Sequence, residues 1–212
     1  MSDLVWYASY GSNLLKDRFM CYIQGGTPAG ASTNFPGCSD KTEPKEDRHL
    51  IIPYTLYFSK ESPTWENKGV AFIKSAKNDK TRTLGRMYLI TSEQFKEIVG
   101  QENFGNLGES HIDIDFDALS KDGELELLAG WYSRIIHLGY EDALPIFTFT
   151  AAWPDDRIKL NPPGVAYLRI IIKGIMETYD LPILDMIDYI YSSEGINGLI
   201  TKEDIVKIIT SI

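Results

Sequence analysis

The sequence predicts an α+β fold, because short β-branched and aromatic runs come before amphipathic helical segments. The strand-like runs lie within the first 150 residues, at 4–9, 50–58, 69–73, 84–90, 126–138 and 145–150. Three helical segments follow them, at 165–179, 183–191 and 202–209. Because the chain has 212 residues, we expect one elaborated domain over 1–212 rather than two small ones.

A turn and a helix are predicted directly after the first strand. The turn is Tyr10-Gly11-Ser12-Asn13, and Ser12 or Asn13 can cap the helix. One face of this helix is apolar, at the spacing of helical neighbours: Leu15, Phe19, Tyr22 and Ile23. Glycines at 25 and 26 are expected to end it.

Two long stretches fit neither a strand nor a helix. Residues 27–47 hold three prolines and mixed charges without periodicity, and 103–125 forms a second excursion. Between them, Thr91 and Gln94 fit a capping box that opens a helix through Val99, with a glycine at its end. The segment from 113 to 117 alternates apolar and acidic residues, which predicts an exposed strand.

Composition excludes several classes of protein. The chain carries 21 basic and 30 acidic residues, a net charge of −9, so the basic face of a nucleic-acid binder is not expected. The apolar stretch 165–176 is interrupted by Arg169, Lys173 and Gly174, so it is too short to span a membrane. No signal peptide is visible, which favours a cytoplasmic location. The oligomeric state is not indicated.

The turn after the first strand is a candidate anion site. Consecutive backbone N–H groups at such a turn, with the free amides of a helix start, can hold a carboxylate or a phosphate. Gly11 lets a ligand approach the backbone closely, because it has no Cβ. An ordinary strand–turn–helix junction with a polar cap is the alternative.

Two further side chains could act at this site. Glu102 can serve as a general base if the fold removes it from water near the turn, whereas a solvated loop glutamate is the alternative. Tyr167 can bond a ligand through its hydroxyl, or it can belong to the core face of its helix.

Metal and nucleotide sites are not expected. The acids at 113, 115, 117 and 124 match four calcium-loop positions, but Ala118 stands where that loop needs glycine. Two cysteines and three isolated histidines give no zinc pattern. Phosphate-binding glycine loops and the serine-hydrolase elbow are also absent from the sequence.

Three blocks in order make the sequence similar to the γ-glutamylcyclotransferase-like family. The first is Tyr10-Gly11-Ser12-Asn13-Leu14, and the second runs from Gly85-Arg86-Met87-Tyr88 through a helix to Gln101-Glu102. The third is Pro162-Pro163 with Tyr167 and the segment from Ile170 to Gly174. The resemblance covers roughly residues 6–192, and Asn103 stands where the family commonly has glycine.

The resemblance implies a small mixed β-barrel flanked by helices, with a pocket at its mouth and a helical C-terminal tail. It also implies cleavage of a small γ-glutamyl amide to 5-oxoproline and a free amine, without a cofactor or a metal. In this comparison the turn Gly11-Ser12-Asn13 holds the substrate's α-carboxylate, and Glu102 moves the protons. Tyr10 shapes the pocket and Tyr167 bonds the polar end of the substrate. A catalytically silent domain of the same fold, binding a small molecule or a partner, is the alternative.

Overall fold

Eight strands form two sheets in the computed structural model, which describes residues 4–28, 34–104, 112–127 and 129–212. The larger sheet holds six strands: β1 (Leu4–Ser9), β2 (Glu46–Ile52), β5 (Thr83–Thr91), β6 (Glu124–Glu126), β7 (Arg134–Glu141) and β8 (Leu144–Thr150). The smaller sheet is a hairpin of β3 (Tyr54–Ser62) and β4 (Lys68–Lys77).

The six strands run in the order β2-β5-β1-β8-β7-β6. The central strand β1 pairs antiparallel with β5 and parallel with β8, so the sheet is mixed. Residues 5 to 9 of β1 are all buried, as expected for a short apolar strand with neighbours on both sides.

The expected closed barrel is not found in the described part of the chain, where two separate sheets stand in its place. They meet where Thr150 of β8 contacts Ile73 of β4. The Thr150 hydroxyl accepts from the Ile73 N–H at 3.0 Å and donates to the Ile73 carbonyl at 2.8 Å. A threonine side chain thus makes the contact that a backbone ladder would make in a barrel.

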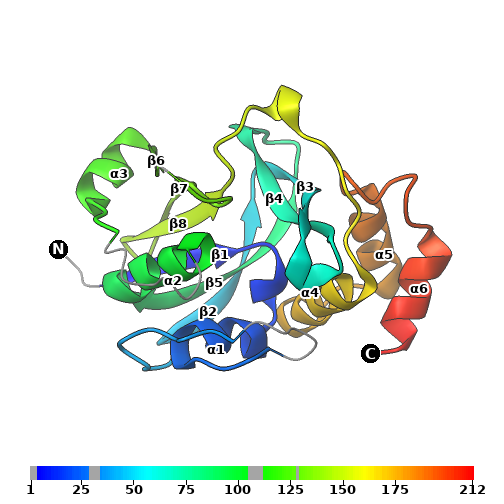
Figure 1. The fold of residues 1–212 in the computed structure, drawn as a ribbon, viewed down its shortest axis with the longest axis horizontal. Helices are drawn as coiled ribbons and strands as arrows, with labels where there is room; N and C mark the ends of the chain where they lie inside the picture. The colour runs from blue at the N-terminus through cyan, green and yellow to red at the C-terminus, as the bar shows by residue number, and fades with distance from the viewer. Residues whose placement is uncertain (1–3, 29–33, 105–111, 128) are drawn as a thin grey trace.

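Two groups of helices lie at opposite ends of the sheet (Figure 1). On one side are α1 (Lys16–Gln24), α2 (Ser92–Phe104) and α3 (Phe116–Asp122). On the other are α4 (Val165–Thr178), α5 (Ile183–Ser192) and α6 (Lys202–Thr210), which confirm the predicted helical tail. Short 3-10 turns lie at η1 (Ser12–Leu14), η2 (Pro63–Trp65) and η4 (Asp155–Arg157).

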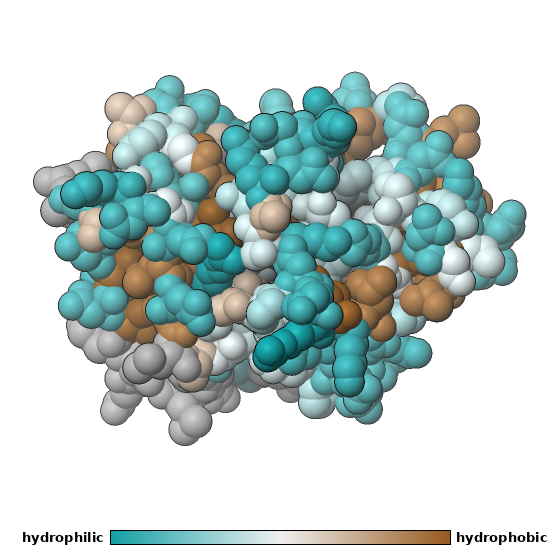
Figure 2. Space-filling view, turned by 90° about the horizontal axis from the view of Figure 1, so that it is seen from above, coloured by the Kyte–Doolittle hydropathy of each residue, from teal (hydrophilic) through white to brown (hydrophobic). Residues whose placement is uncertain are grey.

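The tail helices share a core with the sheet and the hairpin. Trp6 of β1, Phe72 of β4, Ile172 of α4 and Ile205 of α6 belong to one buried cluster. None of the helices in the described ranges combines the length and the apolar character needed to cross a bilayer. The face drawn in Figure 2 is mostly hydrophilic, with its hydrophobic residues in separate patches.

Two predicted strands are corrected by the structure. The single strand expected over 50–58 is two strands, β2 and β3, which are separated at Pro53. Its missing N–H and fixed φ explain why the ladder stops there. The long strand expected over 126–138 is the short β6 and the separate β7.

The expected strand at 113–117 is wrong, because the chain turns into α3 there. The Asp115 carboxylate accepts from the N–H groups of Asp117 and Ala118, each at 3.0 Å, and so caps the helix. An acid at that position has more to gain from two free amides than from an exposed edge. The excursion at 103–125 therefore includes the end of α2 and all of α3.

Candidate active site

The turn after β1 is a 3-10 turn rather than the capped start of a helix. Helix α1 begins at Lys16, and neither Ser12 nor Asn13 caps it, because Leu15 is its N-cap and makes no side-chain bond. Within the described residues, the N–H groups of Gly11, Ser12 and Asn13 have no protein acceptor. Three consecutive amides are therefore free for a ligand.

Close packing explains the glycine in this turn. A Cβ on Gly11 would lie 3.2 Å from the hydroxyl oxygen of Tyr167 and 3.2 Å from the Cβ of Ala71. Both distances are tighter than ordinary van der Waals contact, so any larger residue pushes the turn away from Tyr167.

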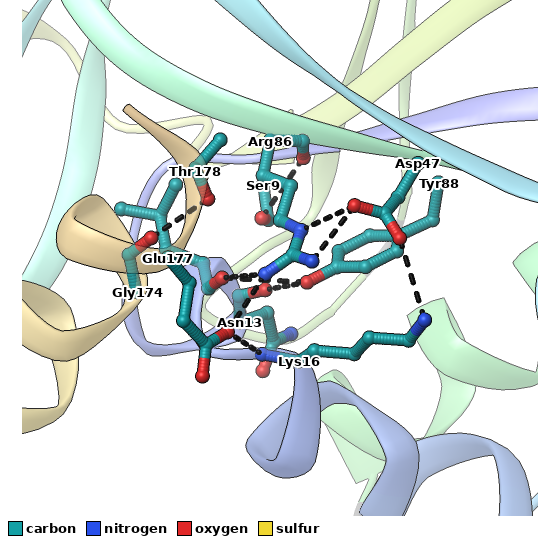
Figure 3. Close-up of polar contacts among 10 residues, drawn as sticks. Ser9, Asn13, Lys16, Asp47, Arg86, Tyr88, Gly174, Glu177 and Thr178 are labelled. Atoms are coloured by element: carbon teal, nitrogen blue, oxygen red, sulfur yellow. Dashed lines mark hydrogen bonds and ion pairs between the residues drawn. The ribbon is translucent and has the colours of Figure 1, made fainter. Parts of the chain in front are cut away.

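Strand β5 holds the turn from behind (Figure 3). The Tyr88 hydroxyl donates to the Asn13 carbonyl at 2.8 Å, and Arg86 donates to the Leu14 carbonyl at 3.1 Å. Arg86 is itself fixed between Asp47, at 2.7 Å, and Glu177, at 2.9 Å. With its carbonyls tied to β5, the turn has its amides left for the other side.

Glu102 lies in the last turn of α2 rather than after a short helix. The helix expected to stop at Val99 continues through Gly100 to Phe104. The Asn13 amide group donates to Glu102 Oε1 at 3.5 Å and to the Tyr7 hydroxyl at 3.1 Å. The longer helix thus brings the acid directly to the turn.

Burial sets the protonation behaviour of this acid. Removal from water raises the pKa of the Glu102 carboxyl above its usual 4.5, although hydrogen bonds from Tyr22 and Asn13 and the charge of Arg18 oppose the rise. The carboxylate is less favoured here than in water, so it is a better base and, once protonated, a proton donor at neutral pH.

The turn and the acid line one small hollow, here called the inner chamber, of about 30 Å³. Its walls include every residue that the sequence singled out: Tyr10, Gly11, Ser12, Asn13, Glu102 and Tyr167. An outer cavity of about 300 Å³ adjoins it. Four residues line both spaces: Ser12, Glu102, Tyr132 and Tyr167. The two spaces therefore form one site with a narrow inner end.

Both predicted tyrosines have hydroxyls engaged with the backbone. The Tyr10 hydroxyl donates to the Phe149 carbonyl at 2.7 Å, so its ring forms wall rather than a ligand contact. The Tyr167 hydroxyl accepts from the Ala71 N–H at 3.2 Å and keeps its own proton for another acceptor. Tyr10 and Tyr167 are 5% and 3% exposed, so each belongs to the core as well as to the site.

Unpartnered polar atoms gather around this hollow. Buried side-chain nitrogen and oxygen atoms without a partner number six in the described ranges. Four of them belong to cavity-lining residues: Asn13 Oδ1, Arg18 Nε, Arg18 Nη1 and Gln101 Oε1. Since buried polar groups are nearly always bonded, these atoms indicate a polar ligand.

Several lining residues were not anticipated from the sequence. Arg18 is one turn before Tyr22, on the helical face that also holds Leu15, and a basic residue within an apolar stripe was the available signal. Tyr132 is fixed by Asn103, which accepts from its N–H at 2.9 Å and donates to its carbonyl at 3.1 Å. The departure from the family pattern at Asn103 thus secures a wall of the site.

Nothing in the described ranges brings three His, Cys, Asp or Glu side chains together as metal ligands. The calcium-like acids include Asp115, which caps α3. Asp113, Asp117 and Glu124 likewise form no such group with it in the part that the structure describes.

Sequence comparison gives one curated relative and no family model. No protein-family model matches the chain. The chain is 38% identical over 185 residues to a protein described as histone deacetylase 5 from Arabidopsis thaliana. That match covers 82% of this chain and 28% of the relative, so the chain spans under a third of the relative's length.

Solved structures are similar over nearly the whole chain. An uncharacterized protein from Homo sapiens matches with a TM-score of 0.52 and 16% identity, covering 98% of this chain and 99% of that one. A structure described as a gamma-glutamyl cyclotransferase matches with a TM-score of 0.48 and 17% identity, again over 98% and 99%. These structures agree with the family resemblance as far as the fold is concerned. Any activity has to be argued from the site.

Proposed function

We propose that the chain is a γ-glutamyl cyclotransferase-like enzyme that releases 5-oxoproline and a free amine from a small γ-glutamyl amide. The observation that carries the proposal is the meeting of the Glu102 carboxyl with the free amides of Gly11 to Asn13 in the inner chamber. An acid with a raised pKa next to an anion cradle suits a substrate that carries both an α-carboxylate and an α-ammonium group.

The reaction is an internal acyl transfer. The α-nitrogen attacks the γ-carbonyl carbon to form a five-membered lactam, and the bond from that carbon to the leaving nitrogen breaks. Because both reacting groups belong to one molecule, holding the substrate folded supplies much of the rate through high effective molarity. Neither a cofactor nor a metal is needed for this bond exchange.

Glu102 moves the protons in the proposed mechanism. As a carboxylate it accepts a proton from the α-ammonium group, which frees the nitrogen lone pair for attack. As a carboxylic acid it then gives that proton to the leaving amine nitrogen. Asn13 orients the carboxyl through its 3.5 Å contact, and the amides of the turn hold the α-carboxylate.

A substrate screen tests this proposal. Purified protein is incubated with γ-glutamyl amines, amino acids and peptides, and released 5-oxoproline is measured. Glu102→Gln is expected to lower turnover by at least ~10²-fold, because an amide cannot shuttle the proton. Glu93→Gln is the matched control, since Glu93 lies on the same helix, is 52% exposed and pairs only with Lys96 in the described contacts.

The outcomes separate the enzyme from a silent binding domain. Equal turnover by the Glu102 variant would remove that residue from the mechanism. No 5-oxoproline from any substrate, together with a rise in Tm on adding a γ-glutamyl compound, would support the binding domain instead. The cytoplasmic location expected from the sequence stays a prediction.

A further inference from the structure

Arg18 is a buried cation that no protein group neutralises. It is 6% exposed on α1 and lines the outer cavity. Its Nη2 donates to the Tyr22 hydroxyl at 3.2 Å, while its Nε and Nη1 have no partner in the described structure. A guanidinium with two unused donors at a cavity wall is built to receive an anion.

Aromatic rings hold this guanidinium in place. It lies over the Phe35 ring at 4.6 Å and over the Tyr22 ring at 4.8 Å. Such stacking fixes the plane of the group without consuming its N–H donors. Arg18 is therefore oriented in advance of any ligand, at a position where burial of an unpaired charge is otherwise unfavourable.

The two anion-holding groups lie at different ends of the site. The free amides of Gly11 to Asn13 line the inner chamber, whereas Arg18 lines only the outer cavity. Glu102 lines both spaces and so lies between them. A substrate whose reacting bond is at Glu102 would extend one carboxylate inward and a second outward.

We infer that Arg18 binds the carboxylate of the leaving amine, so that the substrates are γ-glutamyl amino acids rather than γ-glutamyl amines. This inference rests on the proposed function and adds the leaving group to it. The walls around Arg18 are largely apolar and aromatic, among them Trp65, Val70 and Trp131. We therefore expect a leaving amino acid with an apolar side chain, which an outer cavity of about 300 Å³ can admit.

A pair of substrates that differ by one carboxylate tests the inference. γ-Glutamylphenylalanine and γ-glutamyl-2-phenylethylamine share the same reacting bond and the same ring. Wild-type kcat/KM is expected to favour the acid by on the order of 10- to 100-fold, as a charge-assisted hydrogen-bonded pair provides. Arg18→Gln should bring that preference ratio toward one, with a larger loss on the acid than on the amine.

Two further variants control for folding and for loss of charge elsewhere. Arg48→Gln removes a guanidinium that also stacks on an aromatic ring, at 5.0 Å from Trp6, but lies outside the described cavity linings of the site. It should keep the wild-type preference ratio. If Arg18→Gln does not fold, Arg18→Lys replaces it, because a lysine keeps the charge but not the planar fork. Its ratio should fall by at least ~3-fold, given that a monodentate contact replaces a bidentate one.

Each outcome decides the matter. Equal wild-type turnover of both substrates, or an unchanged ratio in the Arg18 variant that folds, would overturn the inference and leave the proposed function intact. If neither substrate reacts, the proposed function fails, and calorimetric titration with γ-glutamylphenylalanine decides the anion site separately. Binding weakened at least ~10-fold by the Arg18 substitution would support it, and equal binding or none would overturn it.

Discussion

Glu102 is held in the fold against its preference for water. Burial raises the pKa of its carboxyl above 4.5, so the native state keeps a proton at pH values where the unfolded chain has released it. Stability therefore falls as pH rises from the unfolded pKa through the higher folded one, and the whole penalty is present above it. An acid retained at this penalty is typical of a functional site.

Glu102→Gln is accordingly expected to raise stability at neutral pH while it removes activity. At about pH 7 the variant should show a higher Tm than the wild type, because it buries no charge. Toward about pH 4 the difference should shrink, since wild-type Glu102 is protonated there in both states. Thermal unfolding followed by circular dichroism at several pH values measures this. A variant that is less stable than the wild type at pH 7 would contradict the assignment of a desolvated carboxylate.

At the residue scale, some site residues could be predicted and others could not. Gly11 and Asn13 were accessible because a Tyr-Gly-Ser-Asn turn after a strand has a recognisable form and a physical use for free amides. Arg18 was not, because a single arginine in a helix is usually solvated, and only the packing of Phe35 over it reveals a buried one.

Helix α4 is the element that positions the turn from the C-terminal half of the chain. Gly174 of α4 packs directly on the turn, since a Cβ there would lie 2.4 Å from the Leu15 nitrogen and 2.5 Å from the Leu14 carbonyl carbon. Those neighbours are backbone atoms that cannot rotate away. The helix and the turn must separate to admit even one methyl group.

Gly174→Ala is therefore expected to destabilise the protein by about 1–3 kcal/mol and to lower turnover as the turn shifts. Gly100→Ala in α2 is the matched control, because its nearest neighbour is Ile112 Cδ1 at 3.9 Å and the added methyl has room. Alanine favours a helix over glycine by roughly 1 kcal/mol, so this variant should be neutral or more stable. Urea unfolding of both variants gives the comparison, and equal effects would rule out the close packing of α4.

Element boundaries departed from prediction where local and tertiary signals competed. Gly100 indicated a helix end, yet α2 continues because Gln101 donates to the Tyr22 carbonyl at 3.0 Å and anchors the next turn to α1. The capping box was readable in advance, and Thr91 and Gln94 exchange bonds of 3.0 and 3.1 Å. Contacts within four residues were predictable, whereas a helix extended by a distant partner was not.

At the scale of the molecule, the tail helices are bonded to the sheet as well as packed on it. The Tyr179 hydroxyl accepts from the Gly85 N–H at 3.0 Å, and the Tyr189 hydroxyl accepts from the Leu84 N–H at 3.0 Å. Both bonds use amides of β5, the strand whose Arg86 and Tyr88 hold the turn. We therefore propose that residues 1–212 form one domain, with the tail stabilising the site through β5.

One domain implies one unfolding transition, which a substitution in the tail can test. All four tryptophans lie before the tail, at 6, 65, 131 and 153, so their fluorescence reports on the sheet and its loops. Ile205 of α6 is fully buried, and Ile205→Ala should cost about 2–5 kcal/mol. If the chain unfolds as one unit, the fluorescence midpoint shifts together with the helical circular dichroism signal. Val206→Ala, at a neighbouring site that is 41% exposed, should leave both midpoints nearly unchanged. A tail that melts first while the tryptophan transition stays in place would show two units instead of one.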